Sequence, residues 1–368
     1  MNISNAVNKI YYQLKPFIPR WLQILLRRKL VLQKRLLCTD VWPIDEKAGK
    51  IPEGWTGWPE GKKFALVLTH DVETIRGHDR CHHLIKLEKE LGFKSAYYFV
   101  PERYRVSREL RDYLTSEGFE VGVHGLKHDG KLYKSEKIFR KRALKINQYL
   151  KEWQAVGFGS PSMHNNLKWI HELNIEYDSS TFDTDPFEPQ SEGVQTIFPF
   201  RVSDNSTNRG YVELPYTLPQ DFTLFVLMQE KNIDIWKKKL DWIAEHGGMV
   251  LINAHPDYMD FEENGLGIEE YPAEYYKEFL KYIKSEYEGQ YWNVLSMDIA
   301  RFCSKKITNI HTVNTSKKKD INSKKPNILM IVENPFPSDI RVRKVRLSLR
   351  AETLWLDTGM TTRKLKRS

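Results

Sequence analysis

The chain has 368 residues, of which 40% are hydrophobic and 29% charged, a composition that supports a large buried core and excludes a disordered chain or a long coiled coil. The formal net charge of +9 comes from the ends, because residues 1–40 hold eight bases and one acid, and residues 305–368 hold sixteen bases and five acids. The middle of the chain is acidic. We therefore expect no nucleic-acid partner, since a nucleic-acid-binding core would itself be basic.

The three cysteines Cys38, Cys81 and Cys303 are widely spaced and form no CxxC pair, which excludes a disulfide scaffold and a cysteine zinc finger. The sequence contains no apolar run of about 18 residues, so we expect no membrane-spanning helix. The short apolar stretch near the N-terminus is followed by bases instead of the small residues of a signal-peptide cleavage site. We therefore expect a cytoplasmic protein.

Residues 17–37 predict a basic amphipathic helix, in which leucine, isoleucine and tryptophan are interleaved with arginine and lysine. Two interpretations are open: a peripheral contact with an anionic membrane surface, or a basic helix packed on the main domain. A connector rich in tryptophan and proline follows. Residues 1–61 form this N-terminal region.

From residue 62 onward, strand and helix patterns alternate. Apolar strand patterns occur at 64–69, 95–100, 119–123, 155–158, 175–178, 211–215, 249–254 and 292–295. Helical patterns lie between several of them, for example at 79–91 and 107–116. Repeated strand–helix units predict an α/β fold with a parallel sheet or barrel. This predicted domain covers residues 62–303, a Lys/Ser-rich linker follows at 304–325, and residues 326–368 are too few for a core of their own.

Acidic and histidine side chains follow three of the predicted strands, at the ends where α/β folds build their sites. Asp71 and Glu73 are two residues apart on an extended chain and face the same side. His124 and His128 are four apart and can converge on one metal ion. A third histidine, His255, follows a later strand. Each pattern alone is weak, but two histidines and one carboxylate make a metal set suited to hydrolysis, with a second carboxylate as base and a separate histidine as acid.

The order of these motifs resembles that of the polysaccharide deacetylases of carbohydrate esterase family 4, the NodB homology domain. The resemblance covers residues 62–303. It implies a distorted (β/α) barrel that removes N-acetyl groups from amino sugars with a divalent metal ion, usually zinc. The implied partner is an N-acetylated glycan, as found in a cell-surface polysaccharide or its precursor.

The resemblance also implies a role for each motif residue. Asp71 matches the catalytic base of the family, and His255 matches the histidine that protonates the leaving amine. Glu73, His124 and His128 match the metal ligands.

Asp178 falls at the position of the family's fourth motif. The sequence departs from the family pattern in two other motifs. Val72 interrupts the usual adjacent acid pair, and the second acid is a glutamate. Gly159, two residues before Pro161, stands where the family has an arginine that orients the base. Arg201 is a candidate to replace that arginine.

Two alternatives to a deacetylase remain. The glycine at position 159 is compatible with a catalytically weakened homologue that binds carbohydrate. The second alternative is a glycosyltransferase. It is suggested by the Asp183-Thr184-Asp185 motif and by the segment 328–341, which resembles the opening strand, loop and helix of GT-B glycosyltransferases. Because residues 326–368 are too short for that activity, we interpret them as a truncated fusion fragment, with a helix expected near 340–350.

Overall fold

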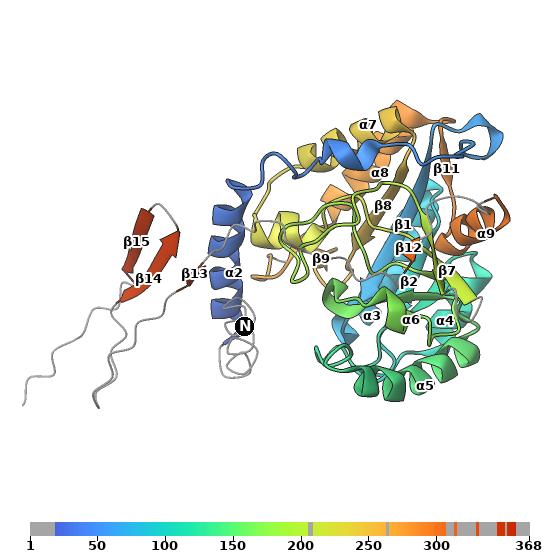
Figure 1. Cartoon of the computed structure of the whole chain (residues 1–368), viewed down its shortest axis with the longest axis horizontal. Coiled ribbons are helices and arrows are strands. Elements are labelled where there is room, and N and C mark those ends of the chain that lie inside the picture. Colours follow the sequence, from blue (N-terminus) through green and yellow to red (C-terminus); the bar gives the residue numbers. More distant parts are fainter. Residues whose placement is uncertain are drawn as a thin grey trace, which may run out of the picture. The chain divides into compact units, whose positions relative to one another are not determined.

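The computed structural model describes residues 19–204, 209–262 and 265–306, and the backbone of four further strand segments, 313–314, 329–330, 344–349 and 352–357 (Figure 1). The chain divides into two units. The larger comprises residues 24–318, and the smaller comprises residues 1–23 with 319–368. Among the described residues, no helix combines the length and the apolar character needed to cross a bilayer.

The larger unit is built on a ten-stranded sheet with the order β11-β1-β2-β3-β4-β5-β7-β6-β12, and β8 pairs with β1 as well. All of these pairs are parallel except β6 with β7. The strands are β1 (Phe64–Val72), β2 (Ser95–Phe99), β3 (Glu120–His124), β4 (Gly157–Gly159), β5 (Tyr177–Asp178), β6 (Phe200–Asp204), β7 (Arg209–Glu213), β8 (Met249–Ala254), β11 (Tyr291–Asn293) and β12 (Val313–Asn314).

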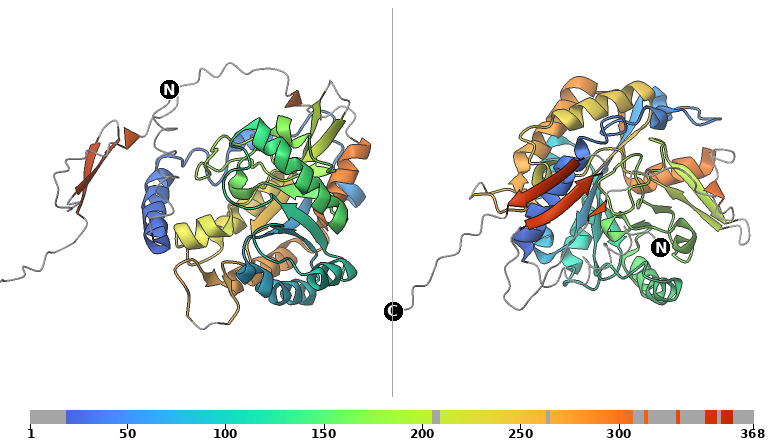
Figure 2. Two further views of the ribbon diagram at one scale, coloured as in Figure 1. Left: turned by 90° about the horizontal axis from the view of Figure 1, so that it is seen from below. Right: turned by 60° about the vertical axis from the view of Figure 1, so that its left-hand side comes forward.

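Helices surround these strands on the outside (Figure 1 and Figure 2). They are α3 (Ile75–Leu91), α4 (Arg108–Ser116), α5 (Glu136–Trp153), the short α6 (Leu167–Ile170), α7 (Asp234–His246), α8 (Ala273–Tyr287) and α9 (Ser296–Lys306). Local signals fix their ends: the Ser107 and Ser135 hydroxyls cap α4 and α5, and Gly92 and Gly247 end α3 and α7 in the left-handed conformation. With helices outside and packed side chains inside, every residue of β1, β2, β3 and β8 is buried.

The sheet closes on itself without a regular strand at the closing edge. The backbone N–H groups of Thr217 and Leu218, which follow β7, both donate to the carbonyl oxygen of Leu251 in β8, at 3.0 and 3.1 Å. The N–H of Met249, at the start of β8, donates to the carbonyl of Ile197 at 2.8 Å. This irregular seam produces the distorted (β/α) barrel predicted from the sequence.

The strand predictions for residues 62–303 are confirmed with shifts of a few residues at the ends. Three strands were not predicted from the sequence: β6, a five-residue strand between β7 and β12 in which apolar and polar side chains alternate, and the short strands β9 (Met259–Asp260) and β10 (Tyr271–Pro272). The two-residue strands β9 and β10 are too short to carry a hydrophobic pattern.

The helix expected over residues 17–37 is α2 (Arg20–Arg35). From Ile24 onward it belongs to the larger unit, where Ile24 and Val31 are buried. Its basic side chains bind the body: Arg28 Nε donates to the carbonyl of Val226 at 2.8 Å, and Lys34 donates to the carbonyl of Pro186. The helix therefore packs on the main domain through a face that is largely basic.

In the smaller unit, the described backbone forms an antiparallel sheet, β13 (Leu329–Met330), β14 (Lys344–Leu349) and β15 (Glu352–Asp357). The helix expected near 340–350 is therefore wrong for residues 344–349. Apolar and polar residues alternate strictly there, a period of two that favours a strand. The linker expected at 304–325 lies outside the described residues, apart from 304–306 at the end of α9 and 313–314 in β12.

Candidate active site

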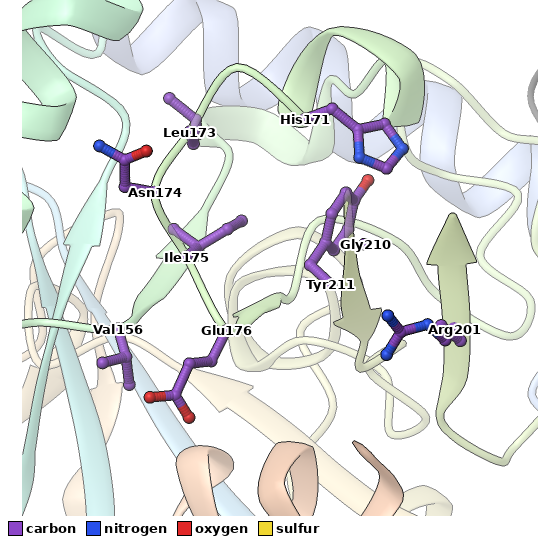
Figure 3. A pocket seen from close by; sticks show the side chains of 9 residues that line it. All are labelled: Val156, His171, Leu173, Asn174, Ile175, Glu176, Arg201, Gly210 and Tyr211. Atoms are coloured by element: carbon purple, nitrogen blue, oxygen red, sulfur yellow. The ribbon is translucent and has the colours of Figure 1, made fainter. Parts of the chain in front are cut away.

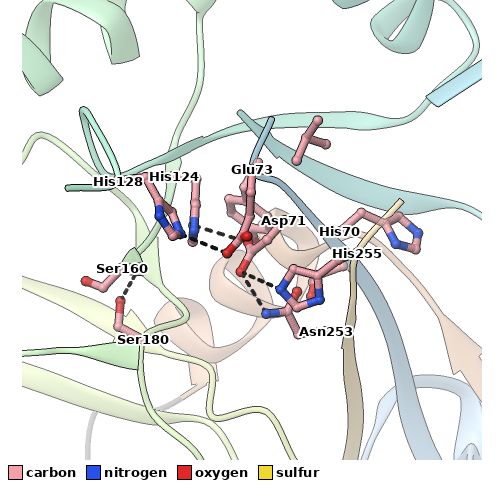
Figure 4. A network of polar contacts seen from close by, with 12 residues as sticks. His70, Asp71, Glu73, His124, His128, Ser160, Ser180, Asn253 and His255 are labelled. Carbon is pink, nitrogen blue, oxygen red and sulfur yellow. Dashed lines mark hydrogen bonds and ion pairs between the residues drawn. The ribbon is translucent and has the colours of Figure 1, made fainter. Parts of the chain in front are cut away.

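The motif residues meet at the carboxyl ends of three strands (Figure 4). Asp71 is the last residue but one of β1, His124 ends β3, and His255 follows directly after β8. Because β1 pairs with both β2 and β8, and β2 with β3, the ends of these strands lie at one rim of the barrel. The fold therefore brings together the side chains that follow the predicted strands.

Three of these side chains form a cluster that fits a metal ion. One ligand atom each from Glu73, His124 and His128 lies within 4.8 Å of the other two. The Nε2 atom of His128 is 2.8 Å from Oε1 of Glu73, and the Tyr258 hydroxyl donates to Oε2 of Glu73 at 2.8 Å. Burial alone would raise the pKa of Glu73, but the adjacent His128 holds that pKa well below its ordinary value. Glu73 is therefore an ionised carboxylate turned toward two imidazoles.

His124 gives the clearest sign that a ligand belongs in this cluster. The side chain is buried, and neither ring nitrogen makes a hydrogen bond within the described part of the chain. Burial lowers the pKa of His124 to about 4, so the ring is neutral at physiological pH. A neutral imidazole is the form that binds a metal ion, and unpaired buried nitrogens are costly unless something binds them. Glu73, His124 and His128 therefore fit a divalent cation.

Asp71 lies between this cluster and His255. Its Oδ1 atom is 3.3 Å from Nδ1 of His124, and its Oδ2 atom is 3.9 Å from Nε2 of His255. The Asn253 side-chain amide donates to Oδ2 of Asp71 at 2.8 Å. The carboxylate is thus held in one orientation, with one oxygen toward each histidine. Asn253 was not predicted as a site residue, although it stands two residues before His255 and so faces the same side of the chain.

His255 is fixed by a buried carboxylate, Asp221. The Nδ1 atom of His255 is 2.7 Å from Oδ1 of Asp221, and the backbone N–H of His255 donates to Oδ2 at 2.7 Å. The Tyr271 hydroxyl also donates to Oδ2, at 2.8 Å. Burial alone would lower the pKa of His255, but the nearby carboxylates, Asp221 foremost and then Glu73 and Asp71, together outweigh it and raise the pKa to about 10. The result is a protonated imidazole whose free nitrogen, Nε2, faces Asp71. Nothing in the sequence pointed to Asp221.

Gly159 borders the same two side chains. A Cβ atom at this position would lie 3.6 Å from Nδ1 of His124 and 3.8 Å from Oδ1 of Asp71, which are ordinary van der Waals contacts. The residue occupies β4, where it pairs with His124. A side chain at position 159 would therefore reach Asp71 directly, and the glycine leaves that side of the carboxylate without a charged neighbour.

Asp178 lies one strand further along, in β5, and belongs to a buried acidic pair. It pairs in register with Glu213 of β7, and burial raises the pKa of both carboxyls, that of Asp178 to about 7. The Ser180 hydroxyl donates to Oδ1 of Asp178 at 2.6 Å and accepts a hydrogen bond from the N–H of Ser160 at 2.9 Å. Asp178 thus supports the loop that follows Gly159, and no hydrogen bond or ion pair in the described part of the chain joins it to the metal-ligand cluster.

Arg201 lines a separate cavity of about 500 Å³ (Figure 3). The lining also includes Val156, Ile175 and Glu176, which immediately precede β4 and β5. The cavity is therefore at the amino ends of strands whose carboxyl ends border the cluster. From there Arg201 does not take the place of the arginine missing at position 159.

The Asp-x-Asp motif at 183–185 is committed to internal contacts. Asp183 is buried and forms an ion pair with buried Lys239, with Nζ 2.8 Å from Oδ2. Asp185 is also buried, and its Oδ2 atom accepts a hydrogen bond from the Tyr216 hydroxyl at 2.7 Å. Both carboxylates are used within the fold, which removes this motif as support for a sugar-nucleotide site.

Aromatic and charged residues connect the cluster to helix α2. The Arg27 guanidinium lies 4.9 Å from the centre of the Phe222 ring, and this ring packs on Tyr258 with centroids 4.7 Å apart. Burial raises the pKa of Glu188 to about 8, while Arg27 and His255 both oppose that rise. Helix α2 therefore stands beside the site.

Comparison with solved structures identifies the fold. The structure is similar to a protein from Mycobacterium smegmatis named as a polysaccharide deacetylase, with a TM-score of 0.54 and 18% identity over 72% of this chain and 98% of the other. The Puue allantoinase gives 0.53 and 19%, covering 74% and 99%, and a Pseudomonas aeruginosa PAO1 protein named as a polysaccharide deacetylase gives 0.52 and 18%, covering 67% and 93%. No protein-family model and no curated protein matches the sequence. The fold is therefore the NodB-type barrel of the polysaccharide deacetylases, as the motifs implied.

Proposed function

We propose that this protein is a metal-dependent hydrolase that removes N-acetyl groups from the amino sugars of a polysaccharide or its precursor. The observation that carries the proposal is the convergence of Glu73, His124 and His128 beside a fixed carboxylate, Asp71, and a protonated imidazole, His255. Amide hydrolysis needs three groups within reach of one bond: a Lewis acid that polarises the carbonyl, a base and an acid. This set of residues would supply the base, the acid and the ligands for the Lewis acid.

Glu73, His124 and His128 would hold a divalent ion, most simply zinc, given the nitrogen and oxygen donors. When bound, such an ion supplies Lewis-acid polarisation of the amide carbonyl. Asp71 accepts the proton of the attacking water at the oxygen that faces His124. His255 donates its Nε2 proton to the departing amine nitrogen, and Asp221 stabilises the imidazolium until that transfer occurs.

The substrate class is inferred from the fold together with the site. Two of the compared structures are named as polysaccharide deacetylases and one as an allantoinase, so the fold alone does not fix the substrate. The site favours cleavage of a carbon–nitrogen bond, because His255 is placed to protonate a leaving nitrogen. A single N-acetyl group on a sugar provides such a bond.

A carbohydrate-binding homologue with weakened catalysis is the second candidate, and the observation that favours it is Gly159. The glycine offers no positive charge to Asp71. Asn253 orients the same carboxylate but is neutral. Glycan binding without turnover is the behaviour expected of this candidate.

The deciding experiment measures acetate release from a panel of N-acetylated glycans, with allantoin as the comparison substrate. The protein is stripped of metal and then reloaded with zinc. We expect acetate release to disappear on stripping and to return with zinc. Binding of a glycan without acetate release by the zinc-loaded protein would favour the second candidate, and hydrolysis of allantoin alone would reject the proposed substrate class.

A further inference from the structure

Leucine side chains of helix α2 and of the residues directly after it are exposed on the surface of the protein. Between 40% and 77% of each residue is exposed at six positions, Leu25, Leu26, Leu30, Leu32, Leu36 and Leu37, which we call the leucine face. Soluble surfaces carry single exposed leucines commonly, but a cluster on one short helix indicates an apolar partner.

The bases of α2 prevent the helix from rolling over to bury this face. Arg28 donates to the carbonyls of Val226 and Ile268 at 2.8 and 2.7 Å, and Arg35 pairs with Glu230. Turning the leucine face inward would break these contacts and leave two carbonyls and Glu230 without their donors, which is costly. The orientation with bases inward and leucines outward is therefore built into the fold.

A neighbouring loop extends the apolar surface. Leu266 and Ile268 are 51% and 40% exposed, and the carbonyl of Ile268 is one of the two that Arg28 binds. The loop is thus tied to the helix at Arg28 by a hydrogen bond, and it adds two exposed apolar side chains to this region of the surface.

Charge selects the partner. Residues 24–37 carry five bases and no acid. A second copy packed face to face would bring two such helices together, and the basic segment 305–368 of this chain would add like charge. An anionic lipid bilayer offers hydrocarbon for the leucines, and negative headgroups for the exposed Lys29 and for the basic segment 305–368.

We propose that the leucine face, with Leu266 and Ile268, docks this protein on anionic membrane surfaces. The proposal does not depend on the reaction proposed above. It does bear on where the site lies, because Arg27 of the same helix contacts Phe222, and Phe222 packs on the Tyr258 ring that binds Glu73. Docking would hold the site close to glycans attached at the bilayer surface.

The test is sedimentation of the full chain with vesicles of phosphatidylcholine alone or with phosphatidylglycerol added. We expect binding to the anionic vesicles and weaker binding to the neutral ones. The triple variant Leu26→Glu, Leu30→Glu, Leu36→Glu should bind the anionic vesicles about tenfold less or weaker still, because buried leucines supply much of the affinity of an interfacial helix. Leu144→Glu is the matched control, since Leu144 of α5 is 71% exposed and lies outside the leucine face.

Equal vesicle binding by the triple variant and the wild type would overturn the proposal, as would an absence of wild-type binding to anionic vesicles. Light scattering on the same samples tests whether the partner is instead a second copy of this chain. That partner would be assigned if the wild type is a dimer, the triple variant is a monomer and neither binds vesicles. Circular dichroism verifies that both variants remain folded.

Discussion

The side-chain amide of Asn253 donates a hydrogen bond of 2.8 Å to Oδ2 of Asp71, the same oxygen that lies 3.9 Å from Nε2 of His255. A neutral donor therefore orients the carboxylate proposed as base. In the family that the motifs resemble, an arginine has that task, and here its position is Gly159. The orientation is retained in this protein, whereas the positive charge is not.

Replacing Asn253 with alanine should lower the rate of acetate release by about 10- to 100-fold, because a hydrogen bond to a charged group contributes roughly 1.5–3 kcal/mol. The loss should appear in kcat, with KM little changed. Asn147→Ala is the control, because the Asn147 amide bonds the carbonyl of Glu172 on an exposed surface of α5. A rate unaffected by Asn253→Ala would show that Asp71 needs no such orientation.

Gly159→Arg should raise the rate by about tenfold or more, the low end of what one positioned electrostatic group contributes. The Cβ atom fits at 3.6 and 3.8 Å from its nearest polar neighbours, and the guanidinium would favour the ionised form of Asp71. The acid limb of the pH–rate profile should therefore move to lower pH. Gly159→Met, a side chain of similar length without charge, should produce neither effect. A slower Gly159→Arg enzyme would contradict the prediction.

His124→Ala and His128→Ala should each weaken zinc binding by on the order of 100-fold or more, since even residues that merely support a ligand contribute 10- to 100-fold. Zinc should raise the melting temperature of the wild type and leave that of both variants unchanged. His82→Ala, on the exposed side of α3, is the matched control. An undiminished zinc stoichiometry in both variants would reject the metal site.

Asp221→Asn should move the alkaline limb of the pH–rate profile to lower pH. The proposed acid must be protonated, and Asp221 is the foremost of the carboxylates that together raise the pKa of His255 from an ordinary 6.5 to about 10, so wild-type activity should persist until the pH rises toward 10. The same pairing stabilises the fold fully below pH 6.5, and that contribution is lost as the pH rises through the folded-state pKa. Asp241→Asn is the control. It removes a charge on α7 that accepts hydrogen bonds from two tyrosine hydroxyls, and it should leave the alkaline limb in place.

The sequence was sufficient for the parts of the site that follow strong strands. The apolar runs of β1 and β8 predict buried parallel strands, and polar residues directly after such strands must lie at one rim. Asp221 could not be found this way, because it is 34 residues from His255 in sequence and reaches it only through the closure of the barrel. The orientation of α2 was equally hidden, since periodicity reveals two faces without saying which one meets the protein.

Because of the irregular seam at Thr217 and Leu218, the proposed metal ligands and the proposed proton donor should differ in how easily local unfolding disrupts them. Glu73 directly follows β1, and His124 and His128 lie at and just beyond the end of β3, in the regular part of the sheet, whereas Asp221 is three residues beyond the seam. Local opening would begin where few ladder bonds resist it. If the proposed site is correct, a zinc-loaded protein that is warmed or mildly denatured would lose the proposed proton donor before the proposed metal ligands, and would pass through a form that holds zinc yet hydrolyses nothing.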